Sequence, residues 1–215
     1  MSKQERVTDT WAQAVLAELA QTDRLRVRRP AWASSGPHLI GPGGDKLLNL
    51  ASNDYLSLAP RPASGTSGAG ASRLVVGTLD VHRQLEQKLA RWLETEDALL
   101  FSSGYAANVG TVTAVAGEGD QLYSDELNHA SLVDGCRLSR ARVSGYRHGD
   151  VDSLRAQVTA DRKQHVAGQK CRAWVITESY FSMDGDLAPL KDIADVCLEH
   201  QLGLIVDEAH ALGVW

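Results

Sequence analysis

An apolar run of strand length, residues 204–206, ends directly before an acid and, three residues further on, a histidine. The carboxyl ends of strands are where open α/β sheets bind their ligands. At such a position Asp207 could hold a cationic ring nitrogen or a metal ion, and His210 could hydrogen-bond to the same ligand. The stretch Leu204–His210 is therefore the first candidate for a functional site.

Three more short polar segments follow predicted strands. Residues 102–108 (SSGYAAN) form a strand-to-helix turn whose backbone N–H groups, next to a glycine, could bind a phosphate. Residues 128–131 (NHAS) place an imidazole at the start of a helix, where a helix cap or an exposed histidine is the plainer interpretation. Residues 178–186 (ESYFSMDGD) form an acidic loop without the ligand spacing of an EF-hand, so a plain turn is favoured over a metal site.

A strand that ends in Asp-Glu-Ala-His, as residues 204–210 do, is also typical of a helicase-type nucleoside triphosphatase. Such a protein needs a P-loop in which Gly-Lys precedes Ser or Thr to hold the phosphates. The sequence contains no such tripeptide, and its net charge of −5 is opposite to the basic surface that nucleic-acid-binding proteins present. We therefore predict no nucleic-acid partner.

The scaffold for these segments can be predicted from the apolar pattern. Short apolar runs alternate with stretches of helix length, which indicates βαβ units and a mostly parallel sheet with helices on both faces. The predicted strands are residues 46–51, 98–101, 121–124, 142–146, 173–177 and 204–207. The predicted helices are residues 81–93, 105–116, 129–140, 151–164 and 190–201, the first capped by Asp80 and the fourth by Asp150.

The N-terminal region is predicted to be an appendage to this α/β fold. Thr8–Thr10 could cap a helix whose apolar stripe is Trp11, Val15 and Leu19, and residues 36–44 are expected to form a loop. We predict an N-terminal helical arm over residues 1–48 and one α/β domain over residues 49–215.

Composition limits the class and the location of the protein. With 43% hydrophobic and 23% charged residues, the chain is typical of a folded globular protein rather than a disordered one. No apolar run approaches the ~20 residues that span a bilayer, and residues 1–6 lack the apolar core of a secretory signal. Cys136, Cys171 and Cys197 are odd in number and form no CxxC pair, which favours reduced thiols. We expect a cytoplasmic protein with no membrane partner.

Taken together, the four segments resemble the α-oxoamine synthase family of pyridoxal-phosphate (PLP) enzymes, which condense an amino acid with an acyl thioester. The resemblance runs from about Asn49 to Trp215. It implies the large domain of a type I PLP fold, here C-terminally truncated, and a homodimer. Residues 127–140 (LNHASLVDGCRLSR) and 181–186 (FSMDGD) are most similar to the branch that condenses L-alanine with pimeloyl-CoA or a pimeloyl carrier protein to 8-amino-7-oxononanoate in biotin synthesis.

The resemblance assigns the candidate residues to one PLP site. Asp207 would pair with the pyridinium nitrogen and keep it protonated, and His129 would stack on the ring. Ser182 and His210 would hydrogen-bond around the phenolic oxygen of the ring, with Glu178 close by.

Two further parts of the site follow from the same resemblance. The turn Ser103, Gly104 and Tyr105 would seat the phosphate of PLP, and Asn53 would face the substrate. Of all these residues, the resemblance implies a direct part in catalysis for His129, Asp207 and His210.

Catalysis in this family also needs a lysine that holds PLP as a Schiff base and moves the α-proton. In the family this lysine follows the Asp207 position further along the chain, beyond residue 215. None of the lysines here lies in a matching motif; they are Lys3, Lys46, Lys88, Lys163, Lys170 and Lys191. We therefore expect these 215 residues to be an N-terminal portion that is inactive alone.

Two alternatives remain open. One is a family member that uses glycine, of the 2-amino-3-ketobutyrate ligase or 5-aminolevulinate synthase type. The other is a non-catalytic homologue that acts as a binding module. Both keep the predicted fold and differ in chemistry.

Overall fold

The structure, a computed structural model, describes residues 7–26, 33–35, 37–41, 43–59, 68, 70–164 and 171–214. The chain divides into two compact units, Met1–Ser57 and Leu58–Trp215. The arm predicted over residues 1–48 falls within the first unit, which continues to Ser57, and the proposed boundary after residue 48 stays a prediction.

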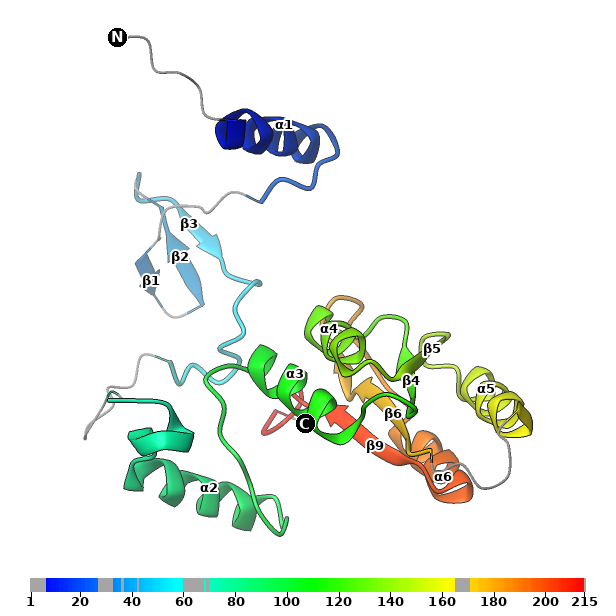
Figure 1. Cartoon of the computed structure of the whole chain (residues 1–215). Coiled ribbons are helices and arrows are strands. Elements are labelled where there is room, and N and C mark those ends of the chain that lie inside the picture. Colours follow the sequence, from blue (N-terminus) through cyan, green and yellow to red (C-terminus); the bar gives the residue numbers. More distant parts are fainter. Residues whose placement is uncertain are drawn as a thin grey trace. The chain divides into compact units, whose positions relative to one another are not determined.

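The first unit contains helix α1 (Val7–Gln21) and a small antiparallel sheet (Figure 1). Its strands β1 (Ala33–Ser35), β2 (His38–Ile40) and β3 (Lys46–Leu48) lie in the order β1-β2-β3. The strand predicted from residue 46 is confirmed at its start, but the loop predicted over residues 36–44 is wrong because it contains β2. The prediction of a cap at Thr8–Thr10 is also wrong, since these residues lie inside α1.

The second unit alternates helices and strands. A π-helical turn (η1, Arg73–Gly77) and α2 (Asp80–Trp92) precede the main sheet. The elements that build the sheet and its layers are α3 (Gly104–Val115), β4 (Gln121–Asp125), α4 (Ala130–Ser139), β5 (Arg142–Tyr146), α5 (Val151–Gln164), β6 (Ala173–Glu178), α6 (Leu190–His200) and β9 (Gly203–Asp207). A short hairpin, β7 (Tyr180–Phe181) and β8 (Asp186–Leu187), follows β6.

The sheet has the order β5-β4-β6-β9, and all of its pairings are parallel. Figure 1 shows α3 and α4 on one face and α5 and α6 on the other. The predicted α/β class with helices on both faces is therefore confirmed. Among the described residues, no helix has the length and apolar character needed to cross a membrane.

Neighbouring side chains along each strand point to opposite faces of the sheet, which explains why helices cover both faces. In β4, Leu122 packs with the α3 and α4 side chains, and its neighbour Tyr123 packs with the α5 and α6 side chains. In β6, Ile176 and Val175 divide between the two layers in the same way. Because successive side chains of a strand point to opposite faces, an apolar run buries both sides of the sheet.

The strand predicted over residues 98–101 is wrong: this segment has no regular secondary structure. The backbone N–H of Leu100 donates to Glu86 Oε1 at 2.8 Å, and its carbonyl accepts from Arg73 Nη1 at 2.8 Å. Side chains of η1 and α2 therefore take the hydrogen bonds that a neighbouring strand would have supplied. The prediction that Asp80 caps α2 is also wrong, because Leu79 occupies that position and its N–H donates to His82 Nδ1 at 3.0 Å.

Candidate active site

Asp207 is fixed in place at the carboxyl end of β9. Parallel pairing with β6 sets it opposite Glu178, so two acids meet at one edge of the sheet. One oxygen of the Asp207 carboxylate accepts from the Asn108 amide at 2.7 Å, and the other accepts from the Ala209 backbone N–H at 2.9 Å. The residue is half-buried, so this oriented carboxylate can still reach a ligand.

A chain of side-chain hydrogen bonds leads from Asp207 to His129. The second N–H of the Asn108 amide donates to Ser131 Oγ at 2.9 Å, and that oxygen lies 2.6 Å from His129 Nδ1. The Ser131 backbone N–H also points at His129 Nδ1, at 3.2 Å. In this geometry Nδ1 accepts from Ser131, and Nε2 is the ring nitrogen that can donate.

Helices α3 and α4 lie close enough together for this chain to form. A Cβ atom added at Gly135 of α4 would lie 3.0 Å from the Val112 Cβ atom of α3. Glycine at this position allows the approach that brings Asn108 on α3 to Ser131 on α4. His129, the residue directly before α4, is exposed, so a flat ligand could reach its ring.

Glu178 holds the backbone of the turn that contains His129. Its Oε1 accepts from the His129 backbone N–H at 2.6 Å, and the residue is only 6% exposed. Burial raises the pKa of Glu178, the hydrogen bond from His129 opposes the rise, and the nearby charge of Asp207 adds to it. The Glu178 carboxyl group therefore fixes the backbone of the turn that leads to His129.

The start of α3 has the features of an anion site. Ser103 caps the helix by accepting from the Ala106 N–H at 3.1 Å. A Cβ atom added at Gly104 would meet no atom within 4 Å, so the space beside this turn is open. Tyr105 donates its hydroxyl to Asp134 Oδ2 at 2.7 Å, which ties the turn to α4. All three turn residues are exposed, as a phosphate seat requires.

The structure also places three further predicted site residues. Ser182 is exposed in the turn between β7 and β8, and His210 is half-buried in the turn after β9. Asn53 is exposed and belongs to the first unit. Their roles stay predictions. Among the described residues, no group of three or more His, Cys, Asp or Glu side chains is arranged to hold a metal ion.

The two connecting residues, Asn108 and Ser131, were not assigned a role from the sequence. Asn108 lies four residues after Gly104, which places it on the same face of α3, one turn inside the helix. Ser131 lies two residues after His129, within reach of a local side-chain hydrogen bond. Helical spacing could therefore have signalled Asn108, whereas the link from Asn108 to Ser131 depends on tertiary packing.

Comparison with known proteins identifies the family of the chain. The family model for aminotransferase class I and II matches residues 45–215. The chain belongs to this family. The aminotransferase class I and II family uses PLP, so its cofactor is the one that the site residues predict.

Two curated relatives of this family member carry the same name. The 8-amino-7-oxononanoate synthase of Acidithiobacillus ferrooxidans is 46% identical over 201 residues, which cover 88% of this chain and 50% of that protein. The protein of the same name from Mycolicibacterium smegmatis is 45% identical over 94% of this chain and 52% of its own length. The chain spans about half the length of the curated relatives it matches.

Solved structures support the type I PLP fold. A serine palmitoyltransferase from Sphingomonas wittichii superposes with a TM-score of 0.76 at 29% identity, over 96% of this chain and 53% of that one. An 8-amino-7-oxononanoate synthase from Francisella tularensis gives a TM-score of 0.52 at 29% identity, over 64% of this chain and 37% of that one.

The residues of this aminotransferase class I and II chain fit PLP chemically. A carboxylate (Asp207) is oriented at a strand end, an exposed imidazole (His129) is joined to it, and open space lies beside the helix start at Gly104. These groups match a pyridinium nitrogen, an aromatic ring and a phosphate, respectively.

Proposed function

We propose that this chain is the PLP-binding part of an acyltransferase of the 8-amino-7-oxononanoate synthase type. The whole enzyme would condense L-alanine with a pimeloyl thioester, carried by CoA or by a carrier protein. The observation that carries the proposal is the fixed carboxylate of Asp207, joined through Asn108 and Ser131 to the imidazole of His129. When bound, PLP supplies an electron-withdrawing ring that stabilises a carbanion.

The residues of the chain would perform the binding and the proton chemistry around that ring. Asp207 would hold the ring nitrogen protonated, and Asn108 would keep the carboxylate aimed at it. His129 would cover one ring face, with Ser131 fixing the plane of the imidazole. Glu178 would fix the backbone of the His129 turn, close to the ring.

The remaining candidate residues would bind the phosphate, the phenolic oxygen and the substrate. Ser103, Gly104 and Tyr105 would bind the phosphate. Ser182 and His210 would donate hydrogen bonds to the phenolic oxygen, and Asn53 would contact the substrate. A homodimer and a cytoplasmic location are part of this proposal by resemblance.

We propose that the Schiff-base lysine comes from residues outside this sequence. The isolated chain is then expected to bind PLP without a covalent link and to show no turnover. Borohydride treatment followed by peptide mapping tests this: no lysine of the chain should be labelled. A labelled lysine would contradict it.

A PLP titration of the chain tests the proposed site. Asp207→Asn removes the negative charge and keeps the shape. A hydrogen bond to a charged group contributes about 1.5–3 kcal/mol, so Kd should rise by about 10- to 150-fold. The matched control is Glu208→Gln, one residue further on and exposed, which should leave Kd unchanged. Equal Kd values for Asp207→Asn and the unchanged chain would contradict the proposal.

The amino-acid substrate separates this proposal from its alternatives. A chain extended through the lysine should form product with L-alanine rather than with glycine. Product from serine would instead favour the chemistry named by the serine palmitoyltransferase neighbours. No product with any amino acid, together with co-purification with a complete synthase, would favour a binding module.

A further inference from the structure

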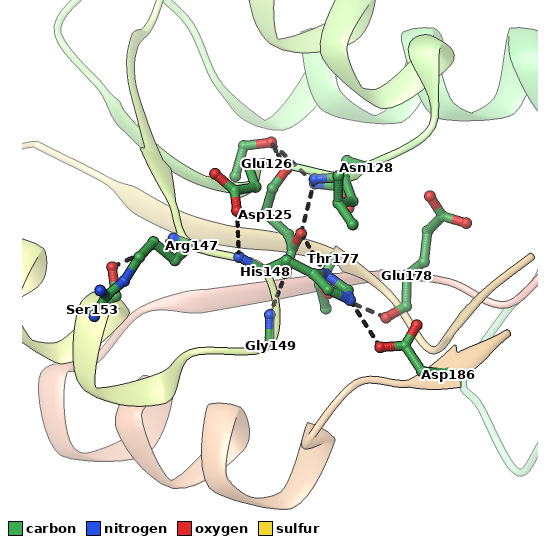
Figure 2. Close-up of polar contacts among 12 residues, drawn as sticks. Asp125, Glu126, Asn128, Arg147, His148, Gly149, Ser153, Thr177, Glu178 and Asp186 are labelled. Atoms are coloured by element: carbon green, nitrogen blue, oxygen red, sulfur yellow. Dashed lines mark hydrogen bonds and ion pairs between the residues drawn. The ribbon is translucent and has the colours of Figure 1, made fainter. Parts of the chain in front are cut away.

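His148, which follows β5, lies between two carboxylates from different elements. Its Nδ1 is 3.0 Å from Asp125 Oδ1 at the end of β4, and its Nε2 is 2.9 Å from Asp186 Oδ2 at the start of β8 (Figure 2). The imidazole also meets the Phe181 ring of β7 edge-on, with centroids 4.4 Å apart and planes at 79°. One side chain therefore contacts β4 and both strands of the hairpin.

This geometry favours a protonated imidazole. Ionised carboxylates only accept hydrogen bonds, and only the imidazolium donates from both nitrogens. Burial lowers the pKa of His148, but the hydrogen bonds and charges of Asp186 and Asp125 outweigh it, so the pKa is raised. Of the other charged groups nearby, Glu126 accepts the His148 backbone N–H at 3.0 Å, and Arg147 pairs with Asp150 at 2.6 Å.

The two carboxylates belong to segments that carry proposed site residues. Asp125 holds the turn that leads to His129: its Oδ1 accepts from the Leu127 N–H at 2.9 Å, and its carbonyl accepts from the Asn128 N–H at 3.2 Å. Asp186 belongs to the hairpin whose turn carries Ser182.

We propose that His148 is a positioning residue of the PLP site, whose imidazolium holds the β7–β8 hairpin against the end of β4 and so places Ser182 relative to the His129 turn. The functional meaning of this clamp rests on the function proposed above. The clamp itself is a property of the fold and can be measured without PLP.

Hydrogen exchange of the hairpin amides tests the clamp. The amide of Gly185 donates to the Phe181 carbonyl at 2.8 Å, and that of Ala188 to the Ser179 carbonyl at 3.0 Å. Below the pKa of His148, His148→Gln should speed exchange of both amides by about tenfold or more, because charge-assisted bonds are lost. In the unchanged chain, exchange corrected for intrinsic rates should rise as pH increases through that pKa.

Two more variants keep the test decisive. Asp186→Asn removes only the half-exposed carboxylate, leaves the buried Asp125 in place, and should move the pH response to lower pH. Asp184→Asn, an exposed acid in the same hairpin turn, is the matched control and should exchange like the unchanged chain. Unaltered hairpin exchange in both His148→Gln and Asp186→Asn would overturn the proposal.

A PLP titration of the same variants separates the clamp from the proposed function. A loosened hairpin with a Kd for PLP raised at least threefold in His148→Gln, and unchanged in Asp184→Asn, supports the positioning role. A loosened hairpin with unchanged PLP affinity would overturn that role. If the unchanged chain binds no PLP, the proposed function fails, and the exchange data alone decide whether the clamp exists.

Discussion

His129 and His148 both follow the carboxyl end of a parallel strand, β4 and β5, respectively. The ring of His129 receives hydrogen bonds from a serine, and its backbone is held by Glu178. The ring of His148 donates toward two carboxylates. The same residue type at the same edge thus accepts hydrogen bonds from a serine in one region and lies between two carboxylates in the other. The partners of a histidine, rather than its place in the sheet, determine its chemistry.

Asp125 joins these two regions. One of its oxygens accepts from the Leu127 N–H in the turn before His129 and from the His148 ring. The other accepts from the Gly149 N–H at 3.1 Å. Because the side chain is only 1% exposed, water cannot replace the lost partners if it is removed.

Removing this shared carboxylate should give the largest effect. Asp125→Ala leaves the partly exposed His148 ring with Asp186 as its remaining carboxylate partner, and it leaves the Leu127 and Gly149 backbone N–H groups without their acceptor. Each unsatisfied buried group costs about 1–3 kcal/mol, so the free energy of unfolding should fall by about 3–5 kcal/mol. Urea denaturation followed by circular dichroism measures this. The control Asp184→Ala removes an exposed acid and should change the free energy by less than about 0.5 kcal/mol. Similar values for both variants would show that the two regions are not joined through Asp125.

Much of the sheet could be predicted from the sequence because apolar runs such as those of β6 and β9 mark its central strands and helix-length stretches separate them. The strand over residues 142–146 and the helix over residues 151–164 match β5 and α5, and Asp150 caps α5 by accepting from the Ser153 N–H at 2.8 Å. The segment 98–101 is equally apolar, yet Arg73 and Glu86 hold it outside the sheet. Periodicity alone cannot detect such tertiary side-chain bonds.

The candidate site, like the sheet, could be predicted only in part from the sequence. Local patterns placed Asp207, His129 and Glu178 at strand ends, where the fold brings them together. The residues that connect or brace them are separated by 23 or more positions along the chain, as Asn108 is from Ser131 and His148 is from Asp125. Such links depend on packing between elements, so a single sequence does not reveal them.

Breaking the hydrogen-bonded chain from Asp207 to His129 should have a smaller effect than removing Asp125. Asn108→Ala takes one donor from the Asp207 carboxylate and one from Ser131 Oγ. The half-buried carboxylate loses a hydrogen bond to a charged group, so the free energy of unfolding should fall by about 1.5–3 kcal/mol. Urea denaturation measures the loss.

Thr113→Ala on the same helix is the matched control for Asn108→Ala. The Thr113 hydroxyl donates to the Val109 carbonyl within α3 at 2.7 Å and is exposed, so its loss should cost less than about 0.5 kcal/mol. A loss in Asn108→Ala no larger than in this control would mean that the link from Asp207 to His129 contributes nothing to stability.

The smallest effect should come from the titration of His148. Its pKa in the folded chain is raised, so its contribution to stability is fully present below the ordinary histidine pKa of about 6.5 and is lost as pH rises through the folded value. The difference in unfolding free energy between the unchanged chain and His148→Gln should therefore be largest at acidic pH and shrink toward alkaline pH. Asp186→Asn should cost less than about 1 kcal/mol, because the Asp186 side chain is 50% exposed. A difference that instead grew with pH would mean that His148 is neutral in the fold, and the contrast with His129 would be lost.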